Sequence, residues 1–203
     1  MHLNRFLSSG LALLLLLVPL GTLSAQGTPA DAHLDSREGY FGNLRQLTFS
    51  GENAEAYFSD DGTRLILQSR TQGEGCDQIY TYDLSTGETR LVSTGEGRTT
   101  CSYYYPGGDR ILYASTHHWD LACPPSPDMS QGYVWALYPT YDLFAADPDG
   151  SNMVQLTSEW GYDAEATFSP VEDLMVFTSM RDGDLEIYTM RGDGSDVRRL
   201  THK

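Results

Sequence analysis

Lysine is almost absent from this sequence of 203 residues, and acidic residues greatly outnumber basic ones. Lys203 is the single lysine among 13 Lys and Arg residues, against which stand 28 Asp and Glu, and the formal net charge is −15. A surface this acidic repels the phosphate groups of nucleic acids. We therefore expect no nucleic-acid partner, and cationic ligands, basic peptides or plain solubility are the roles left for the charge.

Catalytic motifs and long helical patterns are lacking as well. There is no G-x-S-x-G elbow, no H-E-x-x-H metal motif and no helical period of useful length after residue 40. The stretch "DPDGSN" at 147–152 begins like a calcium loop but lacks the glycine required at the sixth position. The sequence argues against a helical domain, and we expect neither enzyme activity nor a cofactor in this chain.

Residues 1–25 have the features of a secretory signal peptide. His2 and Arg5 form a short basic start, 11–18 is an unbroken apolar run, and small residues end the segment at Ala25. The run is shorter than the about 20 apolar residues that span a bilayer. We predict cleavage after Ala25, a linker at 26–43, and a periplasmic or secreted protein that is not integral to the membrane.

A short phrase recurs along the rest of the chain. "RQLT" at 45–48 returns as "VQLT" at 154–157 and "RRLT" at 198–201, with "RLVS" at 90–93 as a weaker copy. The phrase "AEAYFSD" at 54–60 likewise returns as "AEATFSP" at 164–170, and "TCSYYYP" at 100–106 is the diverged middle copy. Repetition at a fixed spacing indicates a repeat architecture.

Short apolar segments lie between these recurring phrases, in the same order in each repeat. They are rich in β-branched and aromatic residues and bounded by Gly, Pro, Asp or Asn, which is typical of strands joined by hairpins. Four such strands in about 45 residues are the blade of a β-propeller. We predict an all-β propeller region at 44–203 with three blades at about 49–93, 94–157 and 158–201, and an insert at 116–140 in the second blade.

The third repeat resembles the TolB-type, WD-like propeller repeat of exported bacterial proteins. The match runs through "FSP" and "VFTSMRDGDLEIYTMRGDGSDVRRLT", and the first repeat shares "FSDDG" and "QIYTYD". The resemblance implies six blades, with the first strand of each blade innermost and the fourth at the rim. It also implies that the loop leading into the first strand and the loop between the second and third strands open on one face.

The rim strand occurs once more often than the other three, because 44–48 precedes the first blade. In the TolB-type family such a strand would complete the last blade of the ring. We therefore expect this chain to be the first half of a longer propeller. A dimer that closes a six-bladed ring from two halves is the alternative, against which the surplus strand argues, and the oligomeric state stays open.

Three cysteines fall on the face with the loops. Cys101 lies before the first strand of the second blade, whereas Cys76 and Cys123 lie between second and third strands. An exported protein tolerates a disulfide, and an odd count leaves one thiol over. We favour Cys76 with Cys101, because neighbouring blades meet there, and Cys101 with Cys123 is nearly as good.

Candidate binding residues lie in the insert and in the loops that lead into the inner strands. The insert is proline-rich and carries His117, His118, Trp119 and Trp135. Zinc bound by His117, Asp120 and Cys123 is conceivable, but the spacing matches no standard site, and we predict no metal. In the other loops Glu55, Cys101 and Glu165 are equivalent positions, and Asp163 lies nearby, so an acidic channel mouth could attract a cation, an amine or a basic peptide.

Three functions remain in competition. The first is a non-catalytic binding or scaffold module for a protein or peptide partner on the loop face. The second is the propeller portion of a peptidase whose catalytic domain lies beyond this chain, since similar propellers occur in such enzymes. The third is a carbohydrate-binding propeller in which Trp119 and Trp135 stack on sugar rings.

Overall fold

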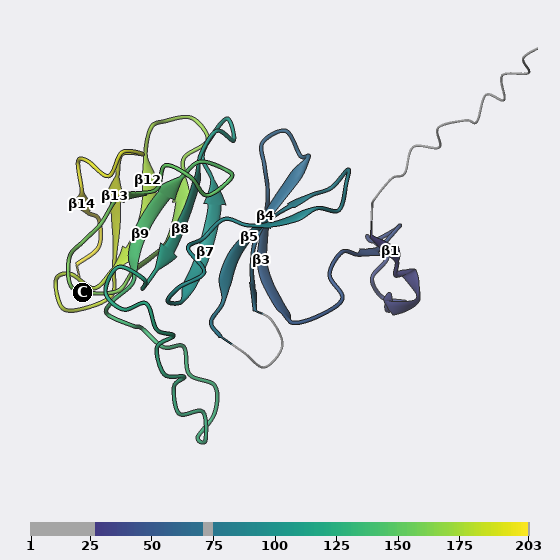
Figure 1. Cartoon of the computed structure of the whole chain (residues 1–203), viewed down its shortest axis with the longest axis horizontal. Coiled ribbons are helices and arrows are strands. Elements are labelled where there is room, and N and C mark those ends of the chain that lie inside the picture. Colours follow the sequence, from purple (N-terminus) through teal and green to yellow (C-terminus); the bar gives the residue numbers. More distant parts are fainter. Residues whose placement is uncertain (1–26, 71–74, 203) are drawn as a thin grey trace, which may run out of the picture.

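The computed structural model describes residues 27–70 and 75–202, and its regular structure is almost entirely β. Three four-stranded antiparallel sheets stand side by side as the blades of part of a β-propeller (Figure 1). The predicted signal peptide lies outside the described residues. Within the described ranges, no helix is long and apolar enough to cross a bilayer.

Each blade is a meander in which consecutive strands are paired. The first blade contains β3 (Glu52–Phe58), β4 (Arg64–Arg70), β5 (Gln78–Asp83) and β6 (Thr89–Leu91). The second contains β7 (Thr99–Tyr104), β8 (Ile111–Ser115), β9 (Asp142–Ala146) and β10 (Val154–Gln155). The third contains β11 (Asp163–Phe168), β12 (Met175–Ser179), β13 (Glu186–Met190) and β14 (Arg198–Arg199).

The recurring Ser or Thr of the "LT" phrase has a structural role. The rim strands pair over only two or three residues. Beyond these residues, a side-chain hydroxyl accepts the hydrogen bond that a backbone carbonyl would otherwise accept. The hydroxyls of Ser93, Thr157 and Thr201 accept hydrogen bonds of 3.0, 2.9 and 2.8 Å from backbone N–H groups of the adjacent third strand. Because a hydroxyl replaces the missing carbonyl partner, the third strand keeps its N–H satisfied where the rim strand ends.

The glycines of the last hairpin turn are required where blades meet. A Cβ added to Gly150 would lie 2.6 Å from the carbonyl oxygen of Val92, and one added to Gly194 would lie 3.0 Å from that of Leu156. Both glycines also have positive φ, +87° and +85°. The "DGS" turns of the repeat thus let each blade approach the rim of the preceding blade closely.

The apolar core is divided between two seams, the interfaces between neighbouring blades. The seam between the second and third blades has the larger cluster. Between the first two blades, Ile66 and Ile79 pack with residues of the second blade such as Tyr113 and Phe144. The larger cluster lies between the second and third blades and includes Leu112, Leu143, Tyr162, Phe177, Tyr188 and Met190. The outward face of the first blade buries only Leu65, Leu67 and Tyr82.

The segment before the first blade covers part of that outward face. β2 (Arg45–Gln46) pairs with β1 (Thr28–Pro29), which precedes a short 3₁₀ helix, η1 (Asp31–His33). Leu47, which directly follows β2, packs against the cluster of the first blade. It is the repeat equivalent of Val92 and Leu156, which pack against the second and third blades. Leu47 therefore contacts the first blade as Val92 and Leu156 contact the second and third blades.

Candidate functional site

The insert at 116–140 projects from the second blade (Figure 1). A disulfide between Cys76 and Cys123, with Cα atoms 5.6 Å apart, ties the insert to the first blade, and Cys101 is free. The predicted pairing of Cys76 with Cys101, and its alternative with Cys123, are thus wrong. The insert folds back across the seam, and this brings Cys123 to Cys76. No thiolate of Cys123 is left for the zinc set considered above.

The start of the insert is held at the seam between the second and third blades. The indole N–H of Trp119 donates a 2.7 Å hydrogen bond to the carboxylate of Asp142, which is fully buried. Asp163 is also fully buried and pairs with Arg181 at 2.9 Å. Burial raises the pKa of both carboxyls, that of Asp142 to about 6. Asp163 therefore lies inside the seam, away from the channel mouth where the sequence had placed it.

The two histidines of the insert are engaged with the scaffold. The Nδ1 atom of His117 lies 2.7 Å from Ser115 Oγ, and its ring packs 4.5 Å from the ring of Phe144. Ser115 is fully buried, so this Ser–His pair cannot reach a substrate as a nucleophile would. His118 lies edge-on to Trp119, with ring centres 6.3 Å apart.

A hollow of about 160 Å³ lies beneath the insert. Tyr133, Trp135 and Tyr138 of the insert form one side, and Arg98 and Asp77 of the blades form another. The guanidinium of Arg98 pairs with Asp77 at 2.7 Å and lies 5.9 Å from the centre of the Tyr138 ring. An apolar hollow with a few fixed polar groups is the usual form of a ligand site.

A larger cavity of about 470 Å³ adjoins the inner strands of all three blades. Glu55 of β3, Cys101 of β7 and Glu165 of β11 line it together, as equivalent positions of the repeat should. Trp135 lines both this cavity and the hollow beneath the insert. The structure thus brings Glu55, Glu165 and Trp135 to one site, whereas Asp163, His117 and Trp119 lie at the seam with His118 beside them.

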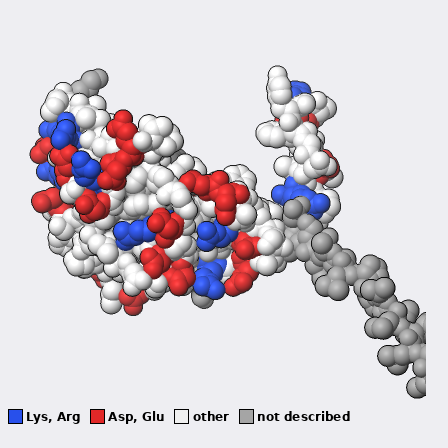
Figure 2. All heavy atoms as spheres, turned by 90° about the horizontal axis from the view of Figure 1, so that it is seen from above, with Lys and Arg blue, Asp and Glu red and all other residues white. Residues whose placement is uncertain are grey.

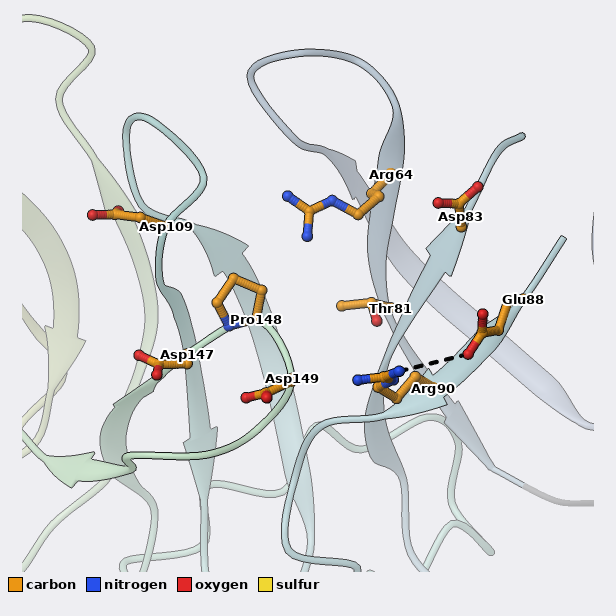
Figure 3. A pocket seen from close by; sticks show the side chains of 9 residues that line it. All are labelled: Arg64, Thr81, Asp83, Glu88, Arg90, Asp109, Asp147, Pro148 and Asp149. Atoms are coloured by element: carbon orange, nitrogen blue, oxygen red, sulfur yellow. Dashed lines mark ion pairs between the residues drawn. The ribbon is translucent and has the colours of Figure 1, made fainter. Parts of the chain in front are cut away.

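Another groove, of about 550 Å³, lies at the hairpin turns between the first two blades. Arg64 and Arg90 extend from the first blade toward the turn that carries Pro148 and Asp149 (Figure 3). Figure 2, viewed from above, shows acidic and arginine side chains interspersed over the blades. Two arginines and five carboxylates line the groove, so its lining is net negative although charges of both signs are present.

Several lining residues of the site were not predicted from the sequence. They are the partly buried ion pair of Arg98 with Asp77 and the tyrosines Tyr57, Tyr103, Tyr133 and Tyr138. Arg98 stands immediately before an inner strand, and this position was the one available signal. The tyrosines could not be singled out, because tyrosine is equally common in the blade cores.

This architecture defines the class of the protein as a β-propeller, and the chain forms part of the ring. No model of a known protein family matches the sequence. Among solved structures, putative TolB from Agrobacterium tumefaciens aligns with a TM-score of 0.59 and 22% identity over 77% of this chain. TolB from Acinetobacter baumannii aligns with a TM-score of 0.58 and 21% identity over 78% of this chain.

The particular likeness is therefore to TolB propellers, as the repeat suggested, and it is a likeness of fold. The chain spans 52% of the first of these proteins and 35% of the second. A structure of prolyl endopeptidases also aligns, with a TM-score of 0.52 and 12% identity, over 76% of this chain and 22% of that protein. The fold is thus shared by TolB and by a peptidase.

Proposed function

We propose that this chain is a non-catalytic propeller module that binds a peptide segment of a partner protein on the face that carries the insert. One observation carries the proposal: Trp135 lines both the hollow beneath the insert and the cavity along the inner strands. A ligand that contacts both would be elongated. A peptide meets this requirement, because its backbone can follow the hollow while one side chain enters the cavity.

The chemistry of the hollow suits a peptide. Tyr133 is 77% exposed and Trp135 is 48% exposed, so both present apolar surface that a partner can cover. Tyrosine, tryptophan and arginine are the residues that carry most of the energy in protein interfaces. The ion pair of Arg98 with Asp77 supplies donors and acceptors beside these rings for backbone groups of the ligand.

Export fits the same proposal. The apolar run at 11–18 is typical of a signal peptide, and the disulfide of Cys76 with Cys123 favours an oxidising compartment such as the periplasm or the exterior. Mass spectrometry of the protein recovered from a periplasmic fraction should show a chain that begins at Gln26. A chain that retains residues 1–25 in the cytoplasm would contradict export.

The function can be tested by selecting peptides from a displayed random library against the whole chain. We expect Trp135→Ala to weaken the selected peptides at least tenfold in fluorescence anisotropy, because it removes the ring that both spaces share. Tyr40→Ala is the matched control, since Tyr40 is fully exposed and lies in the segment before the first blade. That variant should bind as the unaltered protein does.

Two results would overturn the proposal. The first is the enrichment of no peptide together with a ligand from an oligosaccharide array that depends on Trp135, which would establish carbohydrate binding. The second is hydrolysis of a peptide by the whole chain that is lost on a single side-chain change. The likeness to the prolyl endopeptidase propeller would then extend to the reaction.

A further inference from the structure

The inner strands of the three blades share an uncommon backbone feature. The pairing register shifts between Ala54 and Tyr57 in β3, and equivalent shifts occur in β7 and β11. The first residue of each shifted pair is Glu55, Cys101 or Glu165, and their φ angles are 50°, 51° and 59°. This left-handed conformation is disfavoured for any residue except glycine. The repeat nevertheless has a carboxylate or a thiol at all three positions, and glycine at none.

A β-bulge re-aims the side chain of the residue that it carries. Here the three bulges bring two carboxylates and a thiol to the same cavity. Glu165 accepts hydrogen bonds from the hydroxyls of Thr178 at 2.8 Å and Tyr162 at 3.3 Å, which fix its position. Burial, with smaller contributions from both carboxylates, raises the pKa of the Cys101 thiol to about 12, so the thiol is neutral at neutral pH.

A buried hydroxyl in the same cavity lacks a partner. Ser102 lines the cavity and is 1% exposed, and its Oγ atom has no hydrogen-bond partner within the described part of the chain. A buried hydroxyl without a partner is costly unless something else satisfies it. The oxygen can accept a hydrogen bond, but because it is almost fully buried a ligand N–H group would reach it only after the neighbouring side chains moved aside.

Aromatic rings complete the lining. The rings of Tyr57 and Tyr103 lie with their centres 5.0 Å apart, and Trp135 adds a third ring. The faces of such rings attract cations. The residues that line the cavity include no Lys or Arg, so no positive side chain of the lining balances Glu55 and Glu165.

We propose that this cavity binds a cationic side chain of the peptide, an ammonium or guanidinium group, between Glu55 and Glu165. This specificity rests on the peptide-binding function proposed above. The carboxylates would supply the charge, Ser102 Oγ an acceptor, and the rings a surface for the alkyl stem and the cation. A metal ion suits the site less, because no group of three His, Cys, Asp or Glu side chains among the described residues could hold one.

The test uses the whole chain and two small probes, the N-acetyl amide of lysine and the same compound acetylated on its side chain. The second probe keeps the shape but lacks the charge. In an NMR titration we expect the charged probe alone to shift the signals of 55–57, 101–103 and 165–167. The paired change Glu55→Gln with Glu165→Gln should weaken this probe at least tenfold, and added salt should weaken it as well.

Glu172→Gln is the matched control, because Glu172 is exposed in the turn between β11 and β12 and does not line the cavity. Equal binding of both probes, or unchanged binding in the folded paired variant, would overturn the cationic specificity. Displacement of the charged probe by low concentrations of Zn²⁺ or Ca²⁺ would overturn it in favour of a metal. Peptide selection that depends on Trp135 but not on the two glutamates would leave the proposed function standing without this specificity.

Discussion

At the scale of single residues, Asp142 joins the insert to the scaffold. Its carboxylate accepts hydrogen bonds from Trp119 at 2.7 Å, Gln155 at 3.2 Å and Thr157 at 3.3 Å. The nearby carboxyl of Asp163 contributes to raising the pKa of Asp142, and the imidazole of His118 contributes to lowering it. Arg181 forms an ion pair with Asp163. Burial is the largest influence, and it raises the pKa of Asp142 from 3.8 to about 6.

This shift predicts a pH dependence of stability. Because the folded pKa of Asp142 exceeds its unfolded value, the native state holds the proton more tightly between about pH 4 and 6. This group therefore favours folding below pH 4, and its contribution is lost as the pH rises through 6. The loss amounts to about 3 kcal/mol for a shift of about two units. Asp142→Asn should abolish this part of the pH slope in urea unfolding measured from pH 4 to 7.

Asp109→Asn is the control, because Asp109 is an exposed carboxyl in a hairpin turn. The pH slopes of the unfolding free energy of the two variants must be compared, because other carboxyls with a lowered pKa stabilise the fold as the pH rises. Hydrogen bonds to Ser59 and Thr63, for example, lower the pKa of Asp61. If Asp142→Asn and Asp109→Asn gave equal slopes, Asp142 would be ionised in the native state at no cost.

Individual site residues could be predicted from the repeat and, for Trp135, from the aromatic composition of the insert. Glu55 and Glu165 were found because their equivalence across the blades puts them at one end of the inner strands. The same reasoning placed Asp163 at the channel mouth, where it does not lie. Alternation alone would put Asp163 and Glu165 on one face, but the bulge at Glu165 turns only Glu165 toward the cavity and leaves Asp163 in the seam beside Arg181.

At the scale of elements, the insert depends on its two attachments. Trp119 holds its start to the third-blade seam, and Cys123 ties its middle to the first blade. The disulfide closes a loop with a sequence separation of 47 residues. In the loop-entropy model, closing a loop of this length stabilises the folded state by about 4 kcal/mol.

Removal of the disulfide should therefore loosen the insert and destabilise the whole. For the paired change Cys76→Ser with Cys123→Ser, we expect a lower urea midpoint and faster cleavage of 116–140 by a protease. Cys101→Ser is the control, because this thiol is free and its loss leaves the disulfide intact. An insert that resists the protease equally in both variants would show that Trp119 and the packing of the hollow suffice to hold it.

The strands could be predicted well and the insert could not. The short apolar segments between the repeated phrases form the strands of the blades, as expected, because such patterns bounded by turn residues determine strands locally. The insert has neither period nor repeat equivalent. Its course is determined by long-range contacts with Asp142 and Cys76, which no local pattern encodes.

At the scale of the whole molecule, the blades are unequally buried. The inner strand β7 is largely buried, whereas β3 is exposed along most of its length. The repeat-equivalent residues Phe58, Tyr104 and Phe168 show the reason. Tyr104 is 2% exposed and Phe58 is 64% exposed, and the ring of Phe168 packs 4.2 Å from that of Tyr105 in the preceding blade. A preceding blade covers the second and third positions, whereas the first position has no preceding blade among the described residues.

This inequality predicts different effects of the same substitution at equivalent positions. Phe168→Ala should cost about 2 kcal/mol of unfolding free energy, because it removes a ring packed at a seam. Phe58→Ala should cost less than about 0.5 kcal/mol, as is usual for exposed residues. Urea unfolding of this chain at several protein concentrations measures both. An equal cost for the two variants, growing with protein concentration, would contradict the prediction and show that the open face of the first blade is covered in solution by another copy of the chain.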